Sequence, residues 1–239
     1  VTVLAAIGFF TATAASGYLH LEDFESFDDG DDIATSPDWT NWTPSNEICC
    51  YEFVRDKAAS PYTSEDTECF YLWEASDSAL DYGVFTDFMA LDATSDETIG
   101  VCARMNGEYP TDYEVYFAVC RPFADSGYWS FVGLGYKNED GMVVLAEEYY
   151  TFTIVDSFEW HEIGFQVYGD GPVYFDVYLD GESQITHTED EHVISAGHGG
   201  LYYHFIEEEE IICFDNVTQE EADTSITPAS LGEVKATFR

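Results

Sequence analysis

The sequence predicts an all-β protein built as a sandwich of two antiparallel sheets. From residue 18 onward, about twelve short runs rich in Val, Ile, Tyr, Phe and Trp are separated by clusters of Gly, Asp, Asn and Pro. None of these runs has the period of an amphipathic helix, and strands do not alternate with helices as they do in a parallel sheet. Many strands without helical crossovers favour two packed antiparallel sheets.

The chain of 239 residues suits one large domain flanked by two terminal segments. Residues 1–17 are apolar and uncharged and end in small residues, which is typical of a signal peptide and predicts a secreted protein. In the alternative, this segment is an arm that adds to a neighbouring copy and builds a homo-oligomer or filament. We expect the sandwich over residues 18–221 and a linker or tail over residues 222–239.

The charge balance restricts the partners. The formal net charge is −41, because 48 Asp and Glu stand against 7 Lys and Arg. Such a surface repels phosphate backbones and anionic lipids, so we expect no nucleic acid partner and no membrane insertion. The self-repulsion also indicates a saline or calcium-rich environment, in which ions screen the charge.

The clearest two-residue alternation lies in residues 173–179, and residues 160–168 repeat it just upstream. Asp180 and Gly181 then predict a tight hairpin turn. One face of the two adjacent strands is apolar and predicts core positions. The opposite face carries Trp160, Gln166, Tyr168, Tyr174, Asp176 and Tyr178.

These six residues have the chemistry of a sugar site. Flat aromatic rings stack on sugar rings, and carboxylates or amides bind the hydroxyls, provided that the patch is exposed. We therefore predict a ligand-binding platform on this face. The alternative is that the face packs under the second sheet or under a loop.

Six cysteines without a CxxC pair favour disulfides over a zinc site. A hairpin with its turn at residues 106–112 sets two of them opposite each other, a second hairpin sets another two opposite, and one pair remains. The expected disulfides are Cys102 with Cys120, Cys50 with Cys69, and Cys49 with Cys213. The alternative is that the cysteines are free and buried in a reducing compartment.

Several segments in this order resemble the laminin-G and concanavalin A-like superfamily: LEDFESF (21–27), PDWTNW (37–42), FEWHEIGFQVYGDGPVYFDVYLDGE (158–182), GHGGLYY (197–203) and CFDNVTQEE (213–221). The resemblance covers residues 19–221 and implies a jelly-roll sandwich whose first and last strands pair. It also implies a structural Ca²⁺ ion. If those strands are neighbours, Glu22 and Asp215 come close together and are the expected metal ligands, completed by nearby carbonyl oxygens.

Enzymatic motifs are missing from the sequence. The Glu-x-Asp-x-x-Glu strand of jelly-roll hydrolases does not occur, and we expect the lone histidines His161, His198 and His204 to be structural. We therefore predict a secreted recognition module that binds glycan or an extracellular protein surface. One alternative is a structural subunit of a filament or surface layer, and another is a polysaccharide lyase or glycoside hydrolase.

Overall fold

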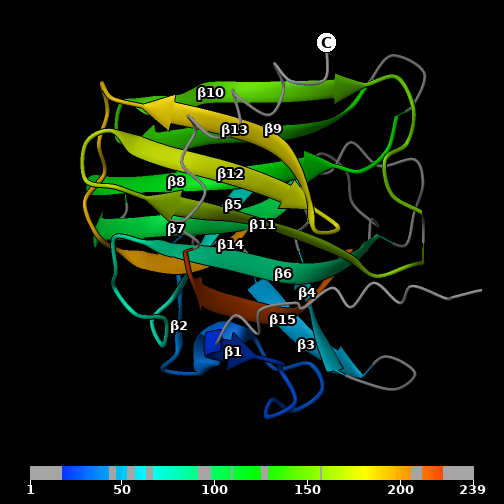
Figure 1. Ribbon diagram of the computed structural model, residues 1–239. Helices are drawn as coiled ribbons and strands as arrows, with labels where there is room; N and C mark the ends of the chain where they lie inside the picture. The colour runs from blue at the N-terminus through cyan, green and yellow to red at the C-terminus, as the bar shows by residue number, and fades with distance from the viewer. Residues whose placement is uncertain are drawn as a thin grey trace, which may run out of the picture.

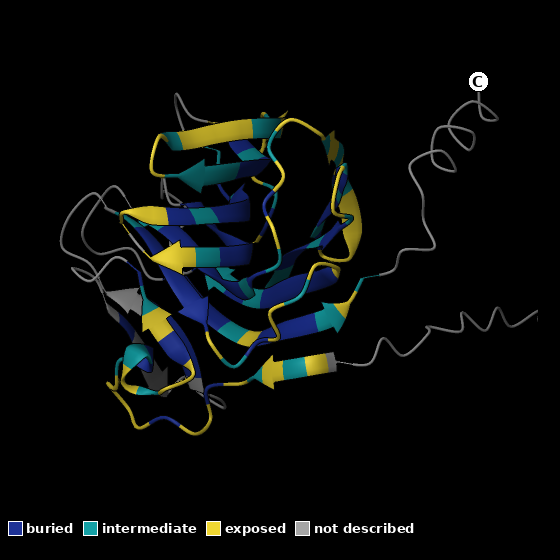
Figure 2. Cartoon of the chain, turned by 90° about the vertical axis from the view of Figure 1, so that its left-hand side faces the viewer, coloured by how far each residue is buried: buried dark blue, intermediate teal, exposed yellow. Residues whose placement is uncertain are grey.

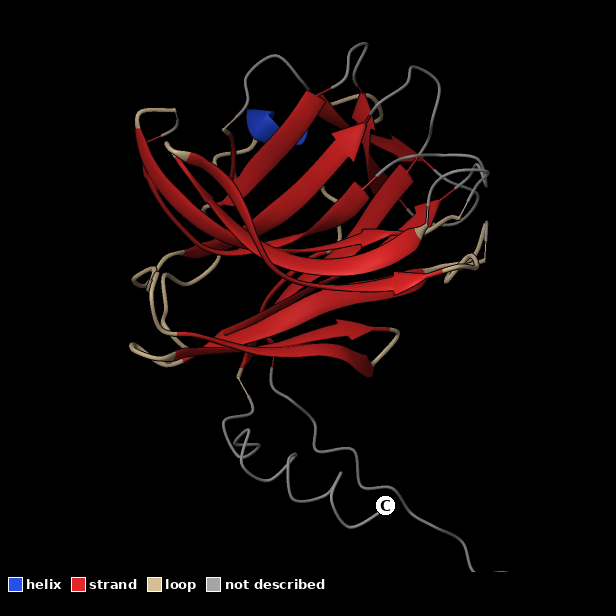
Figure 3. Ribbon diagram, turned by 90° about the horizontal axis from the view of Figure 1, so that it is seen from above, coloured by secondary structure: helices blue, strands red, loops and turns tan. Residues whose placement is uncertain are grey.

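Two antiparallel β-sheets pack face to face, which confirms the predicted all-β sandwich (Figure 1). The structure is a computed structural model that describes residues 18–42, 47–52, 57–62, 67–90, 98–108, 110–124, 129–156, 158–205 and 212–222. These residues form fifteen strands and one short 3-10 helix, η1 (Ile33–Thr35). Figure 3 shows that curved strands make up most of the described chain. No helix within the described ranges has the length and apolarity needed to span a bilayer.

Sheet A has eight strands and contains both the first and the last of the strands that the structure describes. Its main path runs through β13 (Glu182–Glu189), β12 (Val173–Leu179), β11 (His161–Tyr168), β6 (Tyr82–Ala90), β15 (Ile212–Glu221), β4 (Lys57–Tyr62) and β3 (Glu47–Glu52). The remaining strand, β1 (Tyr18–Glu22), pairs with β15. The pairing of the first and last strands, which the family resemblance implied, is therefore confirmed.

Sheet B has seven strands and is built from the middle of the chain. In spatial order they are β10 (Gly141–Tyr150), β9 (Ser130–Asn138), β8 (Asp112–Arg121), β7 (Thr98–Glu108), β14 (His198–Phe205), β5 (Thr67–Trp73) and β2 (Trp39–Asn41). The strand β10 lies at the edge of the sheet and is largely exposed, whereas the facing surfaces of the two sheets are buried (Figure 2).

The alternation that predicted β11 and β12 places their apolar residues in the core between the sheets. Phe165 and Phe175 are fully buried there, and Phe175 meets Tyr116 of sheet B with ring centroids 4.8 Å apart. The predicted turn is also present: Asp180 and Gly181 have φ values of 52° and 72°, and they join β12 directly to β13. This left-handed pair is what a two-residue hairpin loop requires.

The predicted disulfide between Cys102 and Cys120 is wrong. The hairpin closes with Glu108 opposite Asp112, a register that would place Cys102 opposite Ala118. A bulge between Ala103 and Asn106 shifts the pairing by one more residue, so Cys102 lies opposite Phe117 and Cys120 lies opposite Ile99. Cys120 therefore belongs to the core between the sheets, while Cys102 belongs to a second cluster on the outer face of sheet B. Both are free, buried thiols, and burial raises the pKa of each.

The predicted disulfide between Cys49 and Cys213 is also wrong, because Cys213 is a free thiol. The strand β4 separates β3 from β15, so the two backbones lie about 9–10 Å apart, beyond the ~7 Å limit for a disulfide. Burial raises the pKa of Cys213 to about 12. The predicted pairing of Cys50 with Cys69 is wrong as well, because the hairpin that it assumed does not form. Cys50 lies opposite Ala59 of β4 in sheet A, whereas Cys69 lies on β5 in sheet B and is a buried thiol.

Candidate functional site

The predicted aromatic platform lies on the outer face of sheet A. Tyr168 of β11 stands opposite Tyr174 of β12, and Gln166 stands opposite Asp176, with Tyr178 one step further along β12. Tyr168 and Tyr174 stack on each other with ring centroids 5.3 Å apart. One face of each of these two rings is therefore already covered.

The carboxylate of this patch is also engaged. Asp176 is 4% exposed and accepts hydrogen bonds from Thr186 Oγ1 at 2.8 Å and from the Tyr168 hydroxyl at 3.4 Å. Burial raises the pKa of Asp176, and burial together with that carboxylate raises the pKa of Tyr168 to about 12. The patch satisfies much of its own hydrogen-bonding capacity.

Trp160 lies at the opposite end of β11 from Tyr168. It is 44% exposed and precedes β11, eight positions before Tyr168, which is about 27 Å along an extended strand. Tyr178 stands opposite Gly164, midway between Tyr168 and Trp160 along the strand, so the six predicted residues form a row with Trp160 at one end.

The predicted calcium ligands lie on paired strands, with Glu22 opposite Val217 and therefore two residues from Asp215. The Glu22 carboxylate accepts a hydrogen bond from the Phe24 N–H at 2.9 Å, and burial raises its pKa. Within the described part of the chain, no group of three or more His, Cys, Asp or Glu side chains is arranged to hold a metal ion. A Ca²⁺ site made of Glu22, Asp215 and nearby carbonyl oxygens stays a prediction.

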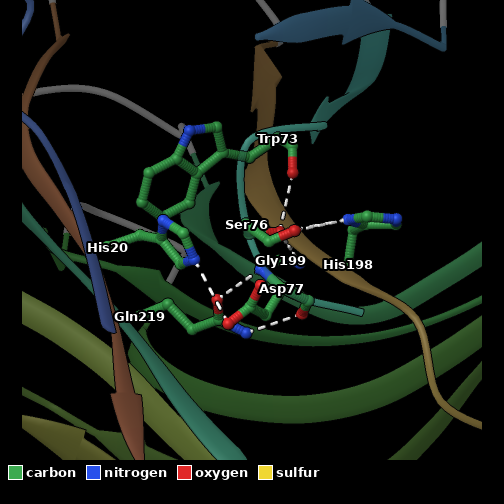
Figure 4. Close-up of polar contacts among 7 residues, drawn as sticks. All are labelled: His20, Trp73, Ser76, Asp77, His198, Gly199 and Gln219. Carbon is green, nitrogen blue, oxygen red and sulfur yellow. Dashed lines mark hydrogen bonds and ion pairs between the residues drawn. The ribbon is translucent and has the colours of Figure 1, made fainter. Parts of the chain in front are cut away.

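A cluster of Ser, His and Asp side chains at the edge between the sheets is structural (Figure 4). The Ser76 hydroxyl donates to the carbonyl of Trp73 at 2.7 Å and accepts from the Gly199 N–H at 2.9 Å. These two bonds and its burial leave Ser76 unsuited to act as a nucleophile. Next to it, Asp77 and Gln219 exchange two hydrogen bonds of 2.7 and 2.8 Å and so join the turn after β5 to β15.

The outer face of sheet B carries a second apolar cluster, which sequence analysis missed. Its members come from the four neighbouring strands β8, β7, β14 and β5 and from the segment after β2, and all are buried: Trp42, Phe70, Leu72, Cys102, Met105, Tyr113, Val115, Phe117, Val119 and Tyr202. The sequence of β8, DYEVYFAVCR, could have indicated this cluster, because the strand is apolar on both faces. Strands that are apolar on both faces are covered on both.

This outer face is concave. Lys137 of β9 and Glu68 of β5 form an ion pair, although three strands lie between β9 and β5. Four strand spacings amount to about 19 Å, farther than these two side chains reach across a flat sheet. The sheet must therefore curl around this face. We call the ion pair the crossbar; the Lys137 ammonium lies 5.3 Å from the centroid of the Phe70 ring beneath it.

The crossbar has a third member. The Tyr202 hydroxyl donates to Glu68 Oε1 at 3.2 Å, and His204 follows on the same face of β14, opposite Glu68 in register. Both charged side chains are only partly exposed, Lys137 by 17% and Glu68 by 21%. An ammonium has three donors and a carboxylate has about four acceptor positions, so the pair retains capacity to bind hydroxyl groups.

On one side of the crossbar lies a groove of about 170 Å³, which we call the Tyr202 groove. Its walls include Phe131, Met142, Glu147, Tyr202 and His204, from β9, β10 and β14. Exposed side chains of β10 form its outer wall, since Met142 is 44% exposed.

Three aromatic side chains continue this wall, and we call them the aromatic rim: Trp129, Phe131 and Tyr149. Trp129 and Tyr149 are 57% and 49% exposed, and their ring centroids lie 6.0 Å apart. Phe131 lies 5.7 Å from Tyr149, and the Arg121 guanidinium lies 5.7 Å from the Phe131 centroid. The Tyr149 hydroxyl donates to Glu147 at 2.6 Å, a bond that raises the pKa of the tyrosine.

No family model matches the sequence, and no curated protein matches it. Solved structures do match. A carbohydrate-binding module of Bacillus subtilis, CBM66, has 21% identity and a TM-score of 0.54, covering 77% of this chain and 96% of that one. A B. subtilis protein of unknown function with a galectin-like fold has 11% identity and a TM-score of 0.60, covering 86% and 97%. The alginate lyase Aly36B has 8% identity and a TM-score of 0.55, covering 84% and 96%. These likenesses confirm the concanavalin A-like jelly-roll fold.

Proposed function

We propose that this protein binds glycan on the concave outer face of sheet B. The observation that carries the proposal is the exposed aromatic rim beside the Tyr202 groove. Large aromatic side chains exposed together on a soluble protein indicate a binding surface. Trp129 and Tyr149 offer ring surface for stacking, and Glu147 and His204 stand within the same groove to bind hydroxyl groups.

The two outer faces of the sandwich differ in what they offer a ligand. On sheet A, Tyr168 stacks on Tyr174 and Asp176 is buried among hydroxyl groups of its own chain. On sheet B, the ring surfaces of the rim are exposed and lie beside a hollow. This difference is why we place the glycan on sheet B, while the sheet A platform stays a prediction that the experiment below also tests.

The similar structures support the proposal. One is described as a carbohydrate-binding module, and the alginate lyase acts on a polysaccharide. We extend the proposal to a secreted protein, because residues 1–17 have the composition of a signal peptide. The alternative role of that segment, as an arm that joins copies into a filament, concerns residues outside the described ranges.

Truncation of exposed tryptophans tests the proposal. Isothermal titration calorimetry against a panel of neutral and anionic polysaccharides identifies a ligand, and Trp129→Ala is then compared with Trp160→Ala. Both tryptophans are exposed and lie outside the strands, so neither change should disturb folding. We expect Trp129→Ala to weaken binding about tenfold or more, as loss of an aromatic anchor does, and Trp160→Ala to bind like the parent protein.

If Trp160→Ala weakens binding and Trp129→Ala does not, the site lies at the Trp160 end of sheet A. If the parent protein binds no polysaccharide, the proposal is wrong. Loss of binding in Tyr174→Ala, with Trp129→Ala unaffected, would support the sheet A platform. The same samples are assayed for new unsaturated or reducing sugar ends. Their appearance would mean that the protein is a lyase or a hydrolase and not a binding module.

A further inference from the structure

A second hollow lies on the concave face, on the other side of the crossbar. We call it the Trp42 pocket; its volume is about 550 Å³. Its apolar lining comes from Trp42, Leu72 and Pro110, and its polar lining includes Thr40, Glu74 and Glu108. Thr40 Oγ1 donates to Glu74 Oε1 at 3.0 Å, and this bond fixes both side chains at the mouth of the pocket. An apolar base beneath hydroxyl and carboxylate groups is the composition of a sugar subsite.

The two hollows share one base but stand at opposite corners of the sheet. Trp42 and Leu72 belong to the same buried cluster as Phe117 and Tyr202, which line the Tyr202 groove. Along β7, the Trp42 pocket reaches Gly107 and the groove reaches Thr98, nine positions away, or about 30 Å. A ligand that fills both must therefore be a chain and cannot be a single sugar.

The crossbar runs diagonally between the hollows. Lys137 stands near the end of β9 that turns into β10, on the side of the β7–β8 turn, and Glu68 stands at the opposite end of β5. Their side chains meet over Phe70, in the middle of the buried cluster. A chain that passes from one hollow to the other crosses the Lys137 and Glu68 groups, whose remaining donors and acceptors can bind its hydroxyls.

The charges of the face select the class of sugar. Among the described side chains, the cations of this face are Lys137, which is paired with Glu68, and Arg121, which lies over the Phe131 ring. The carboxylates of Glu74 and Glu108 line the Trp42 pocket, and Glu147 lines the groove. A uronate or sulfated sugar would meet these negative charges and the net charge of −41, so a neutral sugar is favoured.

We infer that the Trp42 pocket is a second subsite, and that the ligand is a neutral oligosaccharide long enough to occupy both hollows and cross the crossbar. This inference rests on the proposed function, because it extends the same binding face. The Trp42 pocket contributes to the affinity for long chains only, because it lies about 30 Å from the Tyr202 groove.

A filling variant tests the second subsite. Thr40→Trp places an indole at the mouth of the Trp42 pocket, at an exposed strand position that tolerates aromatic residues. Thr188→Trp makes the same change at an exposed position of β13 in sheet A and is the matched control; because Thr188 lies opposite Tyr174, weaker binding in this variant would place the ligand on the sheet A platform. Calorimetry uses gluco-, manno- and galacto-oligosaccharides of increasing length, with alginate oligosaccharides as the anionic series.

In the parent protein, we expect the affinity for one neutral series to rise with chain length. Thr40→Trp should weaken binding of the longest members about tenfold and leave the shortest members unchanged, and Thr188→Trp should match the parent at every length. Alginate oligosaccharides should bind at least tenfold more weakly at equal length.

Each of the other results would contradict one specific part of the inference or of the proposed function. If long chains bind Thr40→Trp as tightly as the parent, the second subsite is wrong and the proposed function stands. If alginate binds as tightly as the neutral series, the inference about sugar charge is wrong. If no oligosaccharide of any series binds the parent, the proposed function itself fails and the inference falls with it.

Discussion

Removal of the Lys137 charge tests the concave geometry of sheet B. In Lys137→Met, the aliphatic stem can still cover the Phe70 ring, while the ion pair with Glu68 is lost. The two side chains are 17% and 21% exposed, so the pair lies between an exposed pair and a buried one. Exposed pairs contribute about 0–1 kcal/mol, and breaking a buried pair costs about 3–5 kcal/mol.

We therefore expect Lys137→Met to lower the free energy of unfolding by about 1–2 kcal/mol at low salt. For a chain of this length, each kcal/mol corresponds to about 2–4 °C in Tm, so Tm should fall by roughly 2–8 °C. Differential scanning calorimetry measures the change. Most of the difference should persist in 1 M salt, because partly buried pairs are screened less than exposed ones.

A double-mutant cycle separates the pair from the individual residues. Glu68→Gln keeps an acceptor for the Tyr202 hydroxyl and removes the charge. If the two side chains interact, the double variant is less destabilised than the sum of the single variants. Strict additivity would mean that Lys137 and Glu68 do not meet, and sheet B would then be too flat to form the crossbar.

Three further outcomes follow from the described residues. Burial raises the pKa of Asp176 above 3.8, so the folded protein loses stability as the pH rises above 3.8 and the buried carboxyl group becomes charged. Measured by calorimetry, Asp176→Asn should therefore be more stable than the parent at pH 7 and equal to it near pH 3. Chelation by EDTA should leave Tm and glycan affinity unchanged, since no group of three or more His, Cys, Asp or Glu side chains among the described residues is arranged to hold a metal ion; a lower Tm would show that a metal stabilises the protein and would support the predicted site at Glu22 and Asp215. The buried thiols of Cys102, Cys120 and Cys213 should react with a thiol reagent only on unfolding, and rapid reaction in the native protein would contradict their burial.

Local patterns were sufficient to predict the strands and one turn. The alternation in β11 and β12 and the Asp180–Gly181 pair depend on neighbouring residues only, and the structure has them as predicted. The Cys102–Cys120 disulfide failed for two reasons. The turn closes at Glu108 and Asp112, which sets Cys102 near Ala118, and the bulge between Ala103 and Asn106 shifts the pairing by one more residue, so the two cysteines lie on opposite faces of the sheet. A bulge changes which residues face each other and which face of the sheet they occupy, and no local pattern in this segment marks its position.

The concave site could not be predicted because it depends on long-range order and curvature. Glu68 and Lys137 are 69 residues apart in sequence and come from strands that are not neighbours. Their contact requires the order of five strands and the curl of the sheet, neither of which appears in any one segment. The apolar residues on both faces of β8 were the available signal, and they indicate a covered outer face without showing what covers it.

The same reasoning explains why the aromatic residues on the two sheets have different consequences. On sheet A, tyrosines from adjacent strands lie opposite each other and stack, as Tyr168 and Tyr174 do, so direct pairing covers part of their surface. On sheet B, curvature brings groups from distant strands together above a buried base, and the edge strand β10 and the segment before β9 hold Tyr149 and Trp129 beside that hollow with their rings exposed. Curvature therefore gives sheet B both a hollow and unoccupied aromatic surface, and a chain of sugars needs both at the same place.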